Sequence, residues 1–262
     1  MKIGIICGHG NGDPGAVSPT FGSEADFVRK LAPLIKKYLS EYAEVNIFET
    51  SINWYSYLQS NYFDFREYDY IIELHGNAGA KDHGGNGKTT GIEIWVTSLE
   101  QAITVEQNIC KAIEKFGLLN RGVKVCDFLV ITAIKKQGVS SCLIENGFID
   151  DFDDMKLISD NIEEYCKILA RSISEGFGLK NKEDSSADEN GKYVIQCGAF
   201  KEYANAKRIS DKINSIGYSN CISKINDYHK VYVGPFKNYE TASEVSANLN
   251  KNKIDNYVLL NN

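Results

Sequence analysis

Residues 3–10 read IGIICGHG, an apolar run that breaks at Gly8 and presents His9 within a glycine-rich turn. The arrangement recurs at residues 70–78, which read YIIELHGNA, and at residues 141–148, which read SCLIENGF. Each run predicts a buried β-strand that ends in a polar residue. Leaving such a side chain unpaired in the interior would be costly, so these strand ends are candidate functional positions.

Strands and helices are expected to alternate over the first two thirds of the chain. Apolar runs at 92–96 and 128–131 predict two more strands, and amphipathic stretches predict helices near 24–39, 99–116 and 159–176. Pro33 lies inside the first of these stretches and should kink or split that helix. This order predicts an α/β fold with a mostly parallel central sheet flanked by helices.

Composition and charge indicate two domains. The 262 residues are 43% hydrophobic and 24% charged, an ordinary globular composition. Residues 180–191 read KNKEDSSADENG and cannot bury a core, so we expect a linker over 179–191 between domains at 1–178 and 192–262. The first domain carries 17 Lys and Arg against 25 Asp and Glu, and the second carries 10 against 6.

The cysteines and the N-terminus bear on where the protein is made. None of the 7 Cys forms a CxxC pair, which favours buried free thiols in a reducing compartment. The first apolar run is too short for a signal peptide, and no stretch approaches the ~20 apolar residues that cross a bilayer. We therefore expect synthesis in the cytoplasm without a signal peptide, and no insertion into a membrane.

The polar residues at the strand ends suit a metal site. In a parallel sheet functional groups gather where strands end, but His9 and His75 are 66 residues apart, so only the fold can bring them together. Ser23 is placed to cap the helix that Glu24 begins, and two His with a carboxylate suit catalytic Zn²⁺. Glu145 would then be the base that takes a proton from water. The alternative is that both His side chains are satisfied by backbone hydrogen bonds.

Four blocks taken together resemble the zinc-dependent N-acetylmuramoyl-L-alanine amidases. They are GHG at 8–10 with DPGA at 13–16, Glu24, LHGNA at 74–78 and IENGF at 144–148. The resemblance implies that His9, Glu24 and His75 bind Zn²⁺ and that Glu145 is the catalytic carboxylate. The implied reaction is hydrolysis of the amide bond between N-acetylmuramic acid and L-alanine in bacterial peptidoglycan.

One residue departs from the family pattern near the second His. Glu73 stands where the family usually has a small residue. By strand alternation Glu73 points to the same side as His75, so it is expected either to orient that ligand or to face solvent. No long insertion separates His75 from Gly91, which leaves no room for the autoinhibitory helix of some relatives.

The C-terminal part contains an internal repeat. Residues 196–203 read QCGAFKEY and residues 232–239 read YVGPFKNY. In each copy a strand-like run leads into the turn at the glycine. A segment with helical spacing comes next, and a further strand follows it. The resulting order βαββαβ predicts a ferredoxin-like, four-stranded antiparallel sheet with two helices on one face.

This repeat resembles the SPOR domain. The resemblance implies binding of peptidoglycan glycan strands that have lost their peptides, and the matching positions are Gln196, Phe200, Tyr232 and Phe236. The alternative for both Phe residues is a role as core anchors. Such a topology would also suit RNA binding, but no strand has the aromatic pattern of an RNA-recognition motif, so we expect no nucleic-acid partner.

Several functions remain open from the residues alone. The same metal set would serve a zinc endopeptidase that cuts within the stem peptide, and a catalytically silent wall-binding protein is a further alternative. A chain with no signal peptide would act on the cell wall after release. Release through a holin pore, as for a phage endolysin, and release by mother-cell lysis, as for an autolysin, are both compatible with the sequence.

Overall fold

The structure, a computed structural model, describes residues 1–10, 12–181 and 191–261. The chain divides into two compact units, Met1–Leu179 and Lys180–Asn262. Of the linker predicted over 179–191, residues 182–190 lie outside the described residues. No helix among the described residues is long and apolar enough to cross a membrane.

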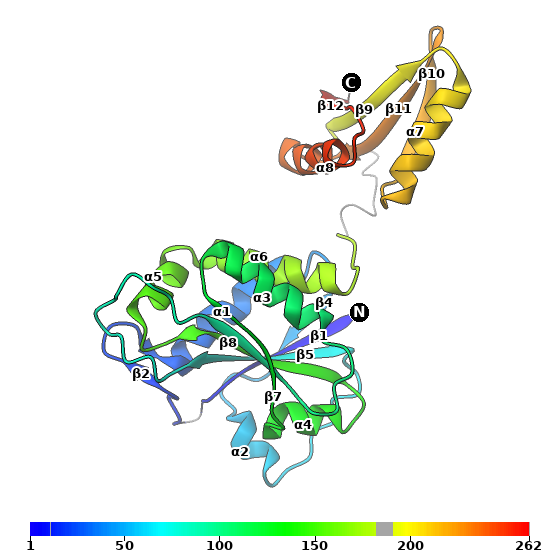
Figure 1. Cartoon of the computed structure of the whole chain (residues 1–262). Coiled ribbons are helices and arrows are strands. Elements are labelled where there is room, and N and C mark those ends of the chain that lie inside the picture. The colour runs from blue at the N-terminus through cyan, green and yellow to red at the C-terminus, as the bar shows by residue number, and fades with distance from the viewer. Residues whose placement is uncertain (11, 182–190, 262) are drawn as a thin grey trace. The chain divides into compact units, whose positions relative to one another are not determined.

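The first unit is built on a six-stranded sheet in the order β4-β1-β5-β8-β6-β7 (Figure 1). Neighbouring strands pair in parallel, except that β6 is antiparallel to β8. The mostly parallel sheet is therefore confirmed, with β6 and β7 running against the other four strands. The strands are β1 (Lys2–Cys7), β4 (Glu44–Ile47), β5 (Tyr70–Asn77), β6 (Ile92–Val96), β7 (Asn120–Val125) and β8 (Ser140–Phe148), with a separate hairpin of β2 (Val17–Ser18) and β3 (Gly22–Ser23).

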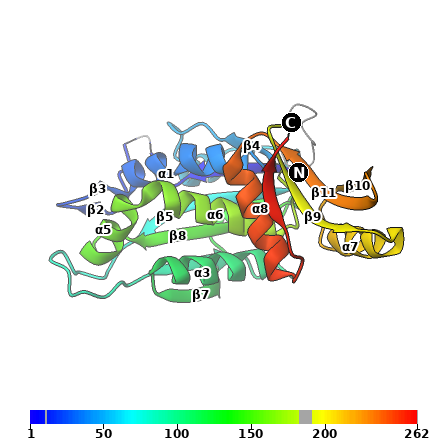
Figure 2. The ribbon, with the colours of Figure 1, turned by 90° about the horizontal axis from the view of Figure 1, so that it is seen from above.

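Three long helices cover one face of the sheet, and α6 lies between α1 and α3 (Figure 2). Their apolar faces pack on alternate strand residues such as Ile5, Ile72 and Ile144, forming the largest core of the unit. The helices of the unit are α1 (Glu24–Leu39), α2 (Trp54–Leu58), α3 (Thr104–Phe116), α4 (Leu129–Lys135), α5 (Phe152–Asp160) and α6 (Ile162–Gly176).

The opposite face carries the two short helices α2 and α4. Ile6 and Ile71 from the sheet pack there in a smaller core with Val130 and Ile134 of α4. Because alternate strand residues share a face, Glu73 lies on this same side, further along its strand.

One local expectation needs correction, and one of two alternatives at Pro33 is ruled out. Residues 128–131 were expected as a strand, but Leu129 begins helix α4, with Val130, Ile131 and Ile134 buried at helical spacing. A short apolar run has no periodicity that separates a strand from a buried helix. Pro33 does not split its helix, since α1 runs unbroken through it with the proline ring on the exposed side.

The second unit has the predicted βαββαβ order and an antiparallel sheet in the order β10-β11-β9-β12. Both helices pack on the face that carries Ile195 and Val233, so the opposite face has no helix among the described residues. The elements are β9 (Tyr193–Phe200), α7 (Tyr203–Ser215), β10 (Asn220–Ile225), β11 (Tyr228–Phe236), α8 (Tyr239–Lys251) and β12 (Tyr257–Leu260).

Candidate active site

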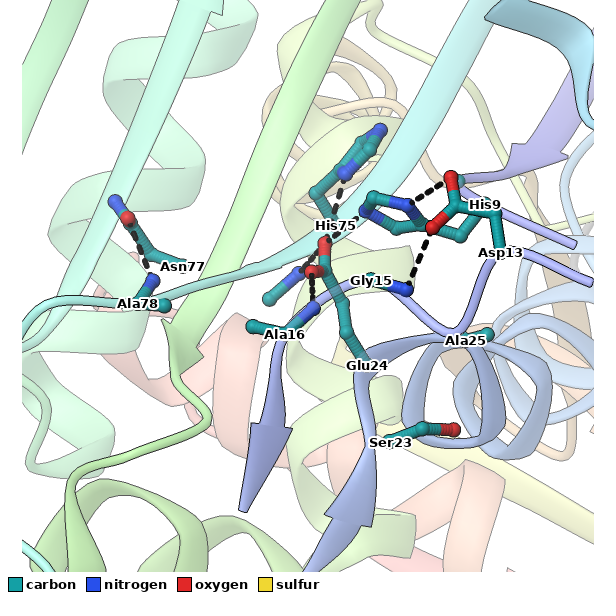
Figure 3. Close-up of polar contacts among 12 residues, drawn as sticks. His9, Asp13, Gly15, Ala16, Ser23, Glu24, Ala25, His75, Asn77 and Ala78 are labelled. Carbon is teal, nitrogen blue, oxygen red and sulfur yellow. Dashed lines mark hydrogen bonds and ion pairs between the residues drawn. The ribbon is translucent and has the colours of Figure 1, made fainter. Parts of the chain in front are cut away.

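Three metal-ligating side chains predicted from separate parts of the sequence meet at one point (Figure 3). His9 follows β1, His75 lies in β5, and Glu24 is the first residue of α1. Glu24 Oε1 lies 3.0 Å from His9 Nε2 and 2.8 Å from His75 Nδ1. The ligand atoms of all three lie within 4.8 Å of one another. Two imidazole nitrogens and a carboxylate oxygen in this arrangement could hold a divalent metal ion.

The backbone around Glu24 fixes its carboxylate. Ser23 caps α1 by accepting a hydrogen bond from the backbone N–H of Asp26, as the sequence predicts. The N–H of Ala16 donates to Glu24 Oε2 at 3.0 Å, and the N–H of Gly76 donates to Oε1 at 3.1 Å. Glu24 is buried, so these bonds replace the water that an exposed carboxylate would have.

Each imidazole contacts a second carboxylate through its other nitrogen. His9 Nδ1 lies 2.9 Å from Asp13 Oδ2, and His75 Nε2 lies 3.2 Å from Glu73 Oε1. Asp13 is itself held by the side-chain amide of Asn53 at 3.0 Å. Such contacts fix the tautomer and the ring orientation of a metal-binding His. Of the two outcomes expected for Glu73, the structure therefore has the one in which it contacts His75.

The mutual contacts shift the pKa values of the three central groups. The hydrogen bond to Glu24 raises the pKa of His9, against a smaller effect of burial. Burial would lower the pKa of His75, but its hydrogen bonds to Glu24 and Glu73 and the charges of Glu73 and Glu145 raise it well above its usual value. Burial would raise the pKa of Glu24, but the hydrogen bonds from His75 and His9 hold it below its usual range.

Glu145 lies beside the three clustered groups. It occupies β8 directly opposite His75 in the parallel ladder. Its Oε2 atom is buried without a hydrogen-bond partner among the described residues. Burial, together with the charges of Glu24, Glu93 and Glu73, raises its pKa to about 7, although the charge of His75 acts in the opposite direction. A carboxylate with a pKa near neutrality can both accept and return a proton.

Asn146 ties the two central strands together. Its side-chain N–H groups donate to the carbonyls of His75 and Ile144, both at 2.9 Å, and its Oδ1 accepts from the hydroxyl of Tyr165 at 3.0 Å. The sequence pattern predicts no role for Asn146, because its partners come from distant parts of the chain. Asp13 was missed in the same way, although its spacing of four residues from His9 was visible.

The four glycan-binding candidates of the second unit fall on two sides of its sheet. Phe236 is buried in the core, and Phe200 packs against that core. Both positions agree with the alternative in which the two Phe residues are core anchors. Gln196 lies opposite Tyr232 in the ladder, on the strand positions that alternate with core residues, and donates a hydrogen bond to the hydroxyl of Tyr257. Tyr257, which the sequence did not single out, thus shares the open face with Gln196 and Tyr232.

Comparisons with known proteins agree with both units. Residues 3–178 match the family model for N-acetylmuramoyl-L-alanine amidase, and residues 189–260 match that for the SPOR domain. The sporulation-specific N-acetylmuramoyl-L-alanine amidase of Bacillus subtilis is 26% identical over 230 residues, covering 85% of this chain and 84% of that protein. The endolysin of Bacillus phage SPP1 is 27% identical over 194 residues, covering 71% of this chain and 69% of that protein.

A solved structure supports the fold of the first unit. The catalytic domain of the CD27L endolysin, which targets Clostridia Difficile, superposes with a TM-score of 0.53 at 25% identity. The match covers 67% of this chain and 97% of that domain. With the matching family model over residues 3–178, the chain belongs to the N-acetylmuramoyl-L-alanine amidase family and carries a SPOR domain after its amidase domain.

Proposed function

We propose that the chain is a zinc-dependent N-acetylmuramoyl-L-alanine amidase in which His9, Glu24 and His75 hold the metal and Glu145 transfers the proton. The observation that carries the proposal is the convergence of the three donor atoms within 4.8 Å of one another beside Glu145. The donors fit Zn²⁺ because its catalytic sites combine imidazole nitrogen with carboxylate oxygen and leave a position for substrate or water.

Amide bonds resist hydrolysis because resonance deactivates the carbonyl group. Zn²⁺ at such a site would polarise the scissile carbonyl and make water easier to deprotonate. Glu145 takes the proton from the attacking water and returns it to the departing nitrogen of L-alanine, so one carboxylate acts first as base and then as acid. Its pKa of about 7 suits both roles near neutral pH.

Metal analysis combined with product analysis tests this function. We expect His9→Ala and His75→Ala to lose both zinc and activity, and Glu145→Gln to keep zinc and lose activity by about 100-fold or more. Digestion of cell wall should release new L-alanine amino groups and leave the glycan intact, and EDTA should prevent this release. Release of other amines would indicate an endopeptidase, and no release would favour a wall-binding protein without catalysis.

For the second unit we propose binding of peptide-free glycan strands across the open face of its sheet. Gln196, Tyr232 and Tyr257 lie on that face, and the domain carries more Lys and Arg than Asp and Glu, which favours attraction to an anionic wall. Phe200 and Phe236 serve this face indirectly, as core residues. The amidase would create the strands that the second unit holds, keeping the enzyme on partly digested wall.

Two comparisons test this role. Deleting residues 180–262 should spare hydrolysis of soluble fragments and weaken attack on intact walls. Tyr232→Ala should reduce sedimentation with peptide-free glycan, whereas Tyr203→Ala, which changes an exposed residue of α7, should not. If the deletion variant is as active as the full chain on soluble fragments and also on intact walls, the proposal is contradicted.

A further inference from the structure

Two basic side chains lie on the edge strand β7, close to the proposed catalytic carboxylate. In the sheet, His75 is paired with Glu145, and Glu145 is paired with Glu93 of β6. The β6–β7 ladder is irregular at Glu93, between the pairs Ile92–Asn120 and Ile94–Val123, and Arg121 lies three residues before Lys124 on β7. A row of polar side chains therefore crosses four neighbouring strands, from a metal-ligand candidate at one end to an arginine at the other.

Both basic groups are held in place by Glu93 and by aromatic rings. Glu93 Oε2 accepts hydrogen bonds from Arg121 Nε at 2.6 Å and Lys124 Nζ at 2.5 Å. The guanidinium of Arg121 lies 4.9 Å from the centre of the Phe148 ring, and Lys124 Nζ lies 5.1 Å from that of Trp95. A cation fixed in this way loses little conformational entropy when it binds an anion.

The charges on this edge are not balanced. Glu93 is one carboxylate for two cations, and its side chain is only 5% exposed, whereas those of Arg121 and Lys124 are 33% and 34% exposed. The remaining positive charge lies next to a cluster of carboxylates in a unit that has an excess of Asp and Glu. A solvent-facing positive charge there would attract an anionic part of the substrate.

The arginine nearest the metal ligands has a different role. Arg29 donates to the backbone carbonyls of Gly8, His9, Ala25 and Thr50, so its guanidinium is used to hold the turn. Arg121 donates to Glu93 through Nε, and its Nη1 lies 3.5 Å from the carbonyl of Thr90. Among the described residues, the Nη2 group of Arg121 has no hydrogen-bond acceptor.

The spacing fits a peptide substrate. Strands of a sheet lie about 4.8 Å apart, so the backbone of Arg121 is about 10 Å from that of Glu145, two strands away. An extended peptide advances about 3.5 Å per residue, so the second residue after a bond cleaved at Glu145 comes within reach of an arginine side chain. We propose that Arg121 and Lys124 form a subsite that binds a free carboxylate on the second residue of the stem peptide.

This proposal rests on the amidase function, and substrates that differ in one group test it. Muramoyl peptides with either a free or an amidated carboxylate on the second residue are compared as substrates. For Arg121→Gln and Lys124→Met we expect kcat/KM on the free carboxylate to fall about 10- to 100-fold, mainly through KM. On the amidated peptide the loss in these variants should be much smaller than on the free carboxylate. Arg121→Lys should keep part of the preference.

Lys156→Met is the matched control, because Lys156 pairs with Asp160 on the exposed side of α5. It should leave kcat/KM on both peptides unchanged. Equal losses on both peptides in the Arg121 and Lys124 variants would mean that these residues only support Glu93, and would overturn the subsite. So would no loss on either peptide.

A binding measurement separates this proposal from the proposed reaction. Calorimetry with the Glu145→Gln variant should show tighter binding of the free-carboxylate peptide than of the amidated one, and Arg121→Gln added to it should abolish the difference. If the wild type hydrolyses neither peptide, the proposed reaction fails, and this calorimetric difference alone then decides the subsite.

Discussion

The backbone of Gly8 lies directly behind the imidazole ring of His75. A Cβ atom added at Gly8 would be 2.4 Å from Cε1 and 2.5 Å from Nε2 of that ring. The ring cannot move away freely, because Glu24 and Glu73 hold its two nitrogens. The glycine of the GHG block is therefore required by the second histidine, which comes from a different strand.

Gly8→Ala should weaken zinc binding. The new methyl group must displace the His75 ring from its contact with Glu24, and we expect metal affinity to fall about 10- to 100-fold. Competition with a chromogenic chelator measures this. Gly84→Ala is the control, since a Cβ there meets nothing within 4 Å. Unchanged affinity in Gly8→Ala would show that the ring has room to move.

The pH dependence of kcat/KM should report Glu145. A carboxylate base works only when ionised, and burial raises the pKa of Glu145 to about 7. Activity should therefore fall as the pH decreases through that pKa, about tenfold per unit below it. Glu93→Gln removes a nearby negative charge and leaves its basic partners, so it should move this acid limb to lower pH by about 1 unit.

Measuring kcat/KM against pH for the wild type and for Glu93→Gln checks the direction of this shift. Glu67→Gln, which changes an exposed partner of Lys2, should leave the limb where it is. A shift of the limb to higher pH in Glu93→Gln would contradict the assignment of Glu145 as the base.

Asp13 and Glu73 should support metal binding without being ligands. Asp13→Asn and Glu73→Gln keep the shape of each side chain but remove the charge that orients an imidazole. We expect each to weaken zinc affinity about 10- to 100-fold. Asp64→Asn, in an exposed pair with Arg66, is the control and should have the wild-type affinity. Wild-type affinity in both test variants would mean that these carboxylates do not position the rings.

Asn146 should matter for folding as well as for the site. Asn146→Ala removes three hydrogen bonds in a fully buried place, and we expect the free energy of unfolding to fall by about 2 to 4 kcal/mol. Trp54 and Trp95 are the 2 Trp of the chain and both lie in the first unit, so their fluorescence in urea follows that unit alone.

Asn61→Ala is the matched control for Asn146→Ala. Asn61 is exposed and donates to the carbonyl of Tyr57, so we expect a change below about 0.5 kcal/mol. Similar losses in the two variants would show that the buried contacts of Asn146 contribute little.

The sequence predicted the parts of the site that lie at the ends of apolar runs. His9, His75 and Glu145 stand at the ends of apolar runs, and a parallel sheet brings such ends to one edge, so their meeting follows from the topology. Glu24 could be placed through its capping residue, Ser23. The positions depend on local pattern and one general rule of sheet geometry, whereas the roles given to these residues came from the resemblance of the four sequence blocks to the amidases.

Other parts depend on pairings that no local pattern contains. The contacts of Glu93 with Arg121 and Lys124 require that β6 and β7 run against the rest of the sheet, with an irregular register between them. The apolar run at residues 128–131 predicts a strand, whereas residues 129–135 form a helix, because four consecutive apolar residues fit either structure. Tertiary packing decides both cases.

The reversal of β6 and β7 separates two tasks within one sheet. The proposed metal ligands come from the end of β1, from β5 and from α1, and the proposed carboxylate subsite comes from β7, so mutations on β7 would alter which peptides are accepted without changing the proposed metal ligands. An engineer could therefore exchange residues 120–125 between relatives to transfer a preference for one peptidoglycan chemistry. Lineages that meet different bacterial walls would have the same route open to them.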